Sequence, residues 1–209
     1  MKKLICIFMA AVMVMLSFAG CSNKAVAYED IDFSEISIDD LTETDKKTDY
    51  VIITIKNYGK IVIRLYPDVA PKTVKNFKNL VAEKFYDGTI FHRVIKNFMI
   101  QGGDPDGDGY GGSDKTIKGE FSANGFENNL KHTRGVVSMA RASKDMNSAS
   151  SQFFICHGNY SDGDGLYAAF GYVVYGMEVV DAIARTPTNS ENRPKTQVLI
   201  ESIKFGKLK

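Results

Sequence analysis

Short runs rich in β-branched and aromatic residues recur along this 209-residue chain, whereas only two segments show helical periodicity. The first run, 50–56, is followed by the turn residues 57–59 and by a second run at 60–66, which predicts an antiparallel hairpin. The composition of later runs predicts further strands at 90–95, 98–101, 135–141, 152–156, 167–174 and 196–205.

Two amphipathic helices are expected between these strands. Pro71 is suited to the first turn of a helix, and the apolar residues that follow it at helical spacing are Val74, Phe77, Leu80 and Val81. A second helix is expected at 177–184. Because the chain has about eight strands and no strand–helix–strand rhythm, we expect a mainly β fold: a closed eight-stranded antiparallel barrel with two capping helices. Side chains fill the interior of a barrel of this size, so a binding site should lie on its outside.

The N-terminus has the pattern of an export signal. Met1-Lys2-Lys3 is followed by the apolar run 4–16 and by small residues that end in Ala19-Gly20-Cys21. This pattern predicts a signal peptide over residues 1–20, and its ending resembles a bacterial lipobox. The resemblance implies lipidation of Cys21, a membrane anchor and an extracytoplasmic location. An uncleaved membrane anchor is the alternative, but the apolar run is short for a span of about 17–25 residues.

Residues 21–49 differ in composition from the rest of the chain. Acidic residues dominate this segment and no long apolar period runs through it, so we interpret 21–49 as the lipidated cysteine followed by an acidic, extended tether. The alternative is a docked segment that uses Ile31, Phe33, Ile36 and Ile38, whose spacing suggests a short ordered piece. Either way the folded domain is expected to span 50–209.

Charge and cysteine content support neither a nucleic-acid partner nor an internal disulfide. Lys and Arg total 26 against 25 Asp and Glu, so no basic excess supports a nucleic-acid partner. Three cysteines are present, of which Cys6 lies in the signal and Cys21 would carry the lipid. The remaining thiol, Cys156, lies in an apolar run and is expected to be buried and inert, with no internal disulfide to form.

The stretch 91–104 carries the strongest functional signal. It places the guanidinium of Arg93 beside large apolar side chains, with the neutral amide of Gln101 and two glycines after them. No nucleophile–base pair and no metal-ligand spacing occur in it, so we expect neither a metal nor a cofactor. This combination suits a site that grips a peptide and rotates it.

Four segments together resemble one family, the cyclophilin-type peptidyl-prolyl isomerases. They are the stretch 91–104, Gly135–Arg141, Ser150–Ile155 and the first helix with its approach, Val69–Phe77, and the resemblance covers about 50–209. It implies rotation of X-Pro bonds, with proline-containing peptides and unfolded exported proteins as partners. We expect the protein to be a monomer.

The resemblance also assigns roles to residues. It implies catalytic roles for Arg93, Gln101 and Phe98. It also implies that the substrate is bound by side chains or backbone groups of six residues: Met99, Ala140, Arg141, Gln152, Phe154 and Tyr167.

The chain departs from the family pattern at two places. Tyr167 stands where many eukaryotic members have His, and Asp162-Gly163 stand where well-known members have a Trp-Leu pair. The protein has no Trp at all. We therefore expect weak binding of cyclosporin-type cyclic peptides and a more open proline pocket.

Parts of the sequence also match three other functions: calcium binding, peptide binding without turnover, and hydrolysis. Asp104, Asp106 and Asp108 follow the opening of an EF-hand loop, but Lys115 stands where a bidentate Glu is needed, so a polar turn is the better interpretation. A proline-peptide binding module or holdase without turnover would use the same groove. A hydrolase would need Ser138 or Ser151 with His132 and an Asp, in a chain with no nucleophile elbow. His92 and His132 lack ligand partners at metal spacing and are expected to be structural.

Overall fold

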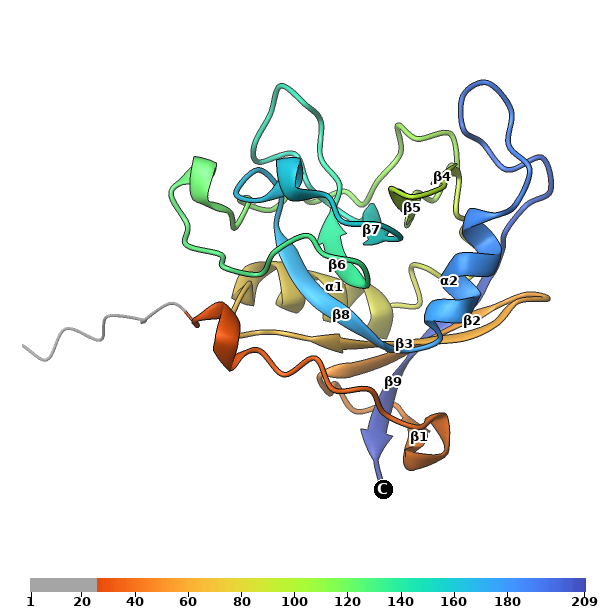
Figure 1. The fold of residues 1–209 in the computed structure, drawn as a ribbon, viewed down its shortest axis with the longest axis horizontal. Helices are drawn as coiled ribbons and strands as arrows, with labels where there is room; N and C mark the ends of the chain where they lie inside the picture. The colour runs from red at the N-terminus through yellow and green to blue at the C-terminus, as the bar shows by residue number, and fades with distance from the viewer. Residues whose placement is uncertain (1–25) are drawn as a thin grey trace, which may run out of the picture.

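A computed structural model describes residues 26–209 (Figure 1). The expected signal peptide and the expected lipidation of Cys21 both fall outside the described residues. Within residues 26–209 there is no helix with the length and apolar character needed to cross a membrane.

The core of the fold is an antiparallel sheet of nine strands. The strands pair in the order β1-β9-β2-β3-β8-β6-β7-β5-β4, so β2 and β3 form the predicted hairpin. Their bounds are β1 Leu41–Thr44, β2 Tyr50–Ile55, β3 Gly59–Leu65, β4 Arg93–Ile95, β5 Met99–Gly102, β6 Val136–Met139, β7 Phe153–Cys156, β8 Ala169–Tyr175 and β9 Ile200–Leu208.

The prediction of a closed eight-stranded barrel is wrong. The sheet has nine strands and its two end strands, β1 and β4, do not pair with each other. The additional strand, β1, lies in the segment 21–49, for which the sequence predicts a tether, and it pairs with the end of β9. The expected strand 90–95 is shorter than predicted because Ile90 makes only single bridges, to Asp104 and to Leu199. Within residues 26–209, therefore, no continuous ladder joins the β4 end of the sheet to β9.

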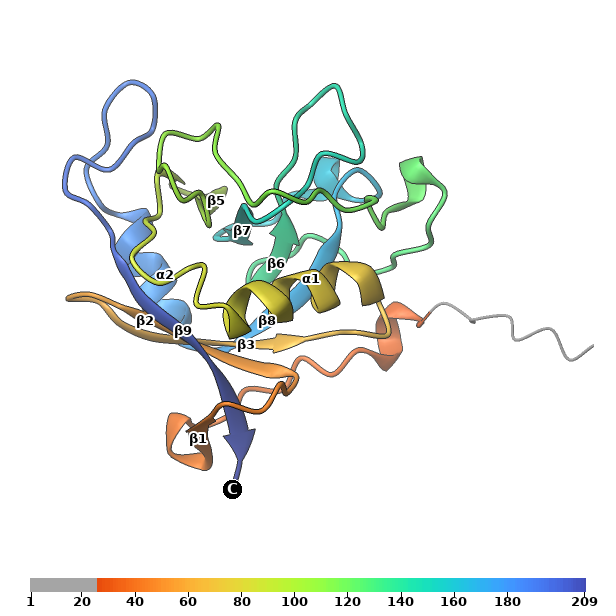
Figure 2. The same ribbon diagram turned by 180° about the vertical axis from the view of Figure 1, so that it is seen from behind.

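Both predicted helices are confirmed, as α1 Pro71–Ala82 and α2 Met177–Ala184. Figure 2 shows α1 in front of the sheet, and the four apolar residues predicted for its inner face are buried. Phe77 lies at the centre of an aromatic cluster with Tyr86, Phe153 and Phe170, at centroid distances of 5.1–5.6 Å. In the described part of the chain there are also four short 3₁₀ helices, at Tyr28–Asp30, Ile38–Asp40, Ser122–Asn124 and Ser161–Gly163.

The first turn of α1 is capped by a distant carboxylate. Glu120 is buried, and its two oxygens accept hydrogen bonds from the backbone N–H groups of Lys72 (3.0 Å) and Thr73 (2.8 Å). The N-terminal N–H groups of a helix have no partner within the helix, so a carboxylate there satisfies two of them and also interacts favourably with the helix dipole.

Residues 26–49 pack against the domain, so the prediction of an extended tether is wrong for this segment and the docked alternative describes it. Ile31 and Leu41 are buried, and the ring of Phe33 lies edge-on to Tyr172 at 4.9 Å. The hydroxyl of Tyr66 donates to the carbonyl of Asp32 (2.6 Å). The apolar side chains of this segment, which alternate with acidic residues in the sequence, thus cover the outer side of the sheet.

Candidate active site

The hairpin β4–β5 places the two central polar side chains side by side. Arg93 on β4 and Gln101 on β5 are cross-strand partners, and Arg93 Nη1 donates to Gln101 Oε1 at 3.1 Å. The guanidinium carbon also lies 5.9 Å from the centre of the Phe98 ring, which is in the turn between the strands. The register of one short hairpin therefore sets a charged fork against an aromatic face.

Gln101 and Gln152 hold each other and the glycine-rich loop. Gln101 Nε2 donates to Gln152 Oε1 (2.8 Å), and Gln152 Nε2 donates to the carbonyls of Gly111 (2.8 Å) and Gly109 (3.1 Å). Arg93 donates to Gln101, Gln101 donates to Gln152, and Gln152 donates to the loop, so all the hydrogen bonds in this series point the same way. Each amide is held in a single orientation.

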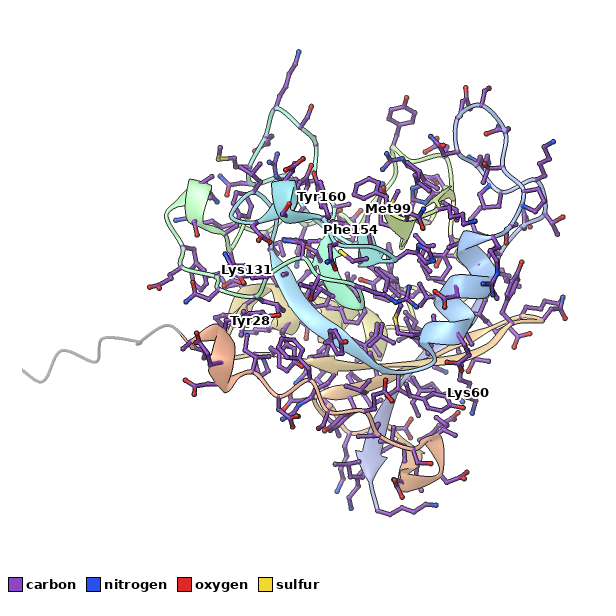
Figure 3. All side chains as sticks on the ribbon, viewed as in Figure 1. Tyr28, Lys60, Met99, Lys131, Phe154 and Tyr160 are labelled. Carbon is purple, nitrogen blue, oxygen red and sulfur yellow. The ribbon has the colours of Figure 1, made fainter. Side chains whose placement is uncertain are left out.

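The apolar floor of the site comes from the middle of the sheet. Met99 on β5 is 1% exposed and Phe154 on β7 is 5% exposed, and both pack in one cluster with Phe98. Figure 3 shows Met99, Phe154 and Tyr160 close together, well away from Lys60. Met99 and Phe154 lie on the paired strands β5 and β7, so the sheet fixes their positions in the floor.

One edge of the site is formed where β6 ends. The N–H of Ala140 donates to the carbonyl of Gln152 (2.9 Å), which leaves the carbonyl of Ala140 as the group suited to pair with a bound peptide. The guanidinium of Arg141 lies 4.8 Å from the centre of the Tyr167 ring, and its Nε donates to the carbonyl of Leu166 (3.0 Å). Arg141 is thus fixed against the wall of the site.

The predicted residues gather around two adjoining cavities, each of about 600 Å³. Eight of the nine line the first cavity, and Gln152 lines the second, which shares Gln101, Ala140 and Arg141 with the first. The residues of the first cavity that were not predicted as site residues are His92, Asp108, Gly109, Tyr110, Tyr160, Glu191 and Arg193. A loop position gives no periodic signal, which is why the sequence pattern did not single out Tyr160 or Tyr110.

His92, next to Arg93, is buried and neither ring nitrogen has a hydrogen-bond partner. Burial lowers the pKa of its imidazole, although the nearby carboxylate of Asp104 acts in the opposite direction. The neutral ring therefore predominates at pH 7, so His92 adds no positive charge beside Arg93.

His132 takes part in a hydrogen-bonded series that resembles a hydrolytic triad. Its Nδ1 lies 3.1 Å from Asp164 Oδ1, and its Nε2 lies 2.9 Å from Ser138 Oγ. Ser138 is fully buried in β6, and neither it nor His132 lines the cavity. A substrate therefore has no access to the hydroxyl, and the arrangement instead fixes His132 beneath Phe154, whose ring stacks on it at 6.0 Å.

The acidic loop after β5 is closed by its own backbone. The buried carboxylate of Asp104 accepts hydrogen bonds from the N–H groups of Gly109 (2.6 Å) and Asp106 (3.0 Å). Burial alone would raise the pKa of Asp104, but these donors outweigh it and the pKa is lowered. Among residues 26–209, no group of three or more His, Cys, Asp or Glu side chains is arranged to hold a metal ion.

Cys156 is buried at the end of β7. Burial raises the pKa of its thiol to about 12, so the reactive thiolate is negligible at neutral pH. The prediction of a buried thiol is confirmed.

Comparison with known proteins agrees with this geometry. The family model described as cyclophilin type peptidyl-prolyl cis-trans isomerase/CLD matches residues 50–205. A peptidyl-prolyl cis-trans isomerase of Acinetobacter baylyi is 45% identical over 71% of this chain and 81% of that protein. The peptidyl-prolyl cis-trans isomerase-like 2 of Rhizopus delemar is 42% identical over 77% of this chain, but the match spans only 29% of that longer protein.

A solved structure shows the same fold. The cyclophilin type peptidyl-prolyl cis-trans isomerase of Cryptosporidium parvum, crystallised in the presence of the dipeptide Ala-Pro, superposes with a TM-score of 0.69 at 36% identity. The match covers 75% of this chain and 98% of that one. The chain belongs to the cyclophilin-type peptidyl-prolyl cis-trans isomerase family.

Proposed function

We propose that the cavity around Arg93 catalyses rotation about X-Pro bonds in peptides and unfolded proteins. The observation that carries this proposal is the placement of the Arg93 guanidinium over Phe98 and in hydrogen-bond contact with Gln101, at the rim of an apolar floor. Such a floor suits a proline ring, and the polar rim suits the amide that precedes it.

The reaction needs no reactive group. Rotation of a prolyl amide is slow because resonance flattens the C–N bond, with a barrier of about 18–20 kcal/mol. The two isomers differ by only about 0.5–1 kcal/mol, so a catalyst need only bind the twisted amide more tightly than either planar form. In the twisted state the lone pair of the prolyl nitrogen is localised and can accept a hydrogen bond.

Arg93 is proposed to supply that hydrogen bond. Its planar fork of donors can contact both the prolyl carbonyl and the prolyl nitrogen, while Met99, Phe98 and Phe154 hold the ring. Gln101 and the Ala140 carbonyl are proposed to hold the peptide backbone on either side. The fixed orientation of Gln101, set by Gln152, means that little reordering is needed when a peptide binds.

Exchange between the cis and trans forms of an Ala-Pro peptide, measured by magnetisation transfer, tests the proposal. We expect rapid exchange with the wild-type protein and a loss of about 10²–10³-fold in Arg93→Ala, the effect of removing one preorganised donor. Lys96→Ala, an exposed cation in the same hairpin turn and outside the cavity, is the matched control. Peptide binding by the wild type with exchange no faster than in Arg93→Ala would instead indicate a binding module or holdase.

We further propose that the protein acts outside the cytoplasm, anchored by a lipid on Cys21, and assists the folding of exported proteins as a monomer. The support is the sequence pattern of residues 1–21, which has a cationic start, a short apolar run and an Ala-Gly-Cys ending. Mass spectrometry of the membrane fraction should detect diacylglycerol on Cys21. A mature chain that keeps residues 1–20, or that carries no lipid, would contradict this proposal without affecting the isomerase assignment.

A further inference from the structure

Tyr160 lies on the wall of the first cavity and belongs to the loop between β7 and β8. Its ring meets the Phe98 ring edge-on at 4.7 Å, and its centroid lies 6.1 Å from that of Tyr167. Tyr160 is only partly buried, so its ring touches the protein on one side and faces the cavity on the other. It therefore continues the aromatic surface of the floor up one side of the site.

The backbone of the same loop holds Tyr160 in place. The N–H of Tyr160 donates to the carbonyl of His132 (2.7 Å), and its carbonyl accepts from the N–H of Gly163 (3.0 Å). His132 in turn is held by Asp164 through its ring and through its backbone N–H (2.7 Å). The position of the loop is thus set on both sides of the tyrosine.

Gly163 determines where the ring can lie. A Cβ added at Gly163 would stand 2.5 Å from both Cδ1 and Cε1 of Tyr160, far inside van der Waals contact. The φ of Gly163 is not positive, so what glycine provides here is space rather than an unusual backbone conformation. Gly163 itself is buried and does not line the cavity.

From these contacts we propose that Tyr160 is a substrate-binding residue, whose ring packs against the pyrrolidine ring of the bound proline, and that Gly163 sets its position. The inference rests on the proposed function of the cavity and adds a binding residue to it. Proline-containing segments bind well to aromatic-lined grooves because the prolyl ring is apolar and already stiff. An aromatic side chain offers a large contact area, and it loses little conformational freedom when a ligand binds.

The first test removes the ring. Tyr160→Ala is expected to lower kcat/KM for an Ala-Pro peptide about tenfold, which corresponds to about 1.4 kcal/mol. Tyr160→Phe keeps the ring and should recover most of that loss. Ser161→Ala, an exposed neighbour outside the cavity, is the matched loop control and should behave as the wild type.

The second test moves the ring without touching it. Gly163→Ala should force the Tyr160 ring aside, which a flexible side chain can do without unfolding the loop, and should reproduce the loss seen in Tyr160→Ala. In the Tyr160→Ala background the same substitution should cause no further loss, because no ring remains to be displaced. Equal losses in both backgrounds, or wild-type kcat/KM in Tyr160→Ala, would overturn the proposal.

Binding separates this inference from the proposed function. Titration of the Ala-Pro dipeptide into protein with ¹³C-labelled tyrosine rings should shift the Tyr160 ring signals, even in Arg93→Ala, which is expected to have lost exchange. No shift on saturation would refute the role of Tyr160 whether or not the wild type is active. A shift in a wild-type protein that shows no exchange would support Tyr160 and refute catalysis.

Discussion

Truncation of Leu41 tests whether the N-terminal segment is part of the folded domain. Leu41 begins β1, is 7% exposed and packs with Ile52, Val62 and Val174. Leu41→Ala removes about three methylene equivalents at about 0.8 kcal/mol each, or roughly 2.4 kcal/mol. Buried Leu→Ala substitutions cost about 2–5 kcal/mol in general. A position on an end strand can relax, so we expect about 2–3 kcal/mol.

Equilibrium unfolding in urea, followed by circular dichroism, measures this loss. With a slope of about 2 kcal/mol per molar urea, the midpoint should fall by roughly 1 M. Glu35→Ala, an exposed residue of the same segment, should leave the midpoint nearly unchanged. Isomerase activity in the absence of urea should be unaffected, since Leu41 lies outside both cavities. If Leu41→Ala behaved like Glu35→Ala, the segment would contribute nothing to the stability of the domain and the docked description would fail.

Two further substitutions probe buried titratable groups. Glu120→Gln replaces one of the two oxygens that accept from the first turn of α1 with an amide nitrogen, and should lower the free energy of unfolding by about 1–3 kcal/mol in the same urea assay. Burial lowers the pKa of His92 in the folded state, so below about pH 6.5 the unfolded chain binds more protons than the folded chain. The free energy of unfolding should therefore decrease as the pH is lowered through that range. His92→Phe cannot titrate and should make the urea midpoint less dependent on pH between 7.5 and 5.5; an unchanged dependence would show that other groups govern it.

The parts of the fold that could be predicted are those whose signals are local. The first helix begins at Pro71 and buries Val74 and Phe77 as expected, because a proline in the first turn and the 3.6-residue spacing of apolar residues are both local signals. The pairing of Arg93 with Gln101 is similarly local, since eight residues and one turn separate them. A motif of this kind determines both the local fold and the site residues within one short segment.

The parts that escaped prediction depend on distant partners. Leu41 pairs with Leu208, and no feature near either residue indicates the other. Without that pairing, residues 41–44 look like an acidic linker, and the number of strands and the state of closure are both misjudged. Tyr160 was not predicted for the same reason. The position of its ring depends on contact with Phe98, in the distant β4–β5 hairpin, and on the space left by the missing side chain of Gly163.

The docked segment also changes what the proposed lipid anchor would do. Val26, where the described residues begin, is already held to the domain, since its carbonyl accepts a hydrogen bond from Asn129 Nδ2 (3.2 Å). A chain extends at most about 3.3–3.6 Å per residue, so a lipid on Cys21 could lie no more than about 18 Å from Val26. An undocked tether from 21 to 50 could reach roughly 100 Å by the same rule. Under the proposed anchoring, the isomerase would therefore work beside the membrane surface, where exported chains emerge, rather than at a distance from it.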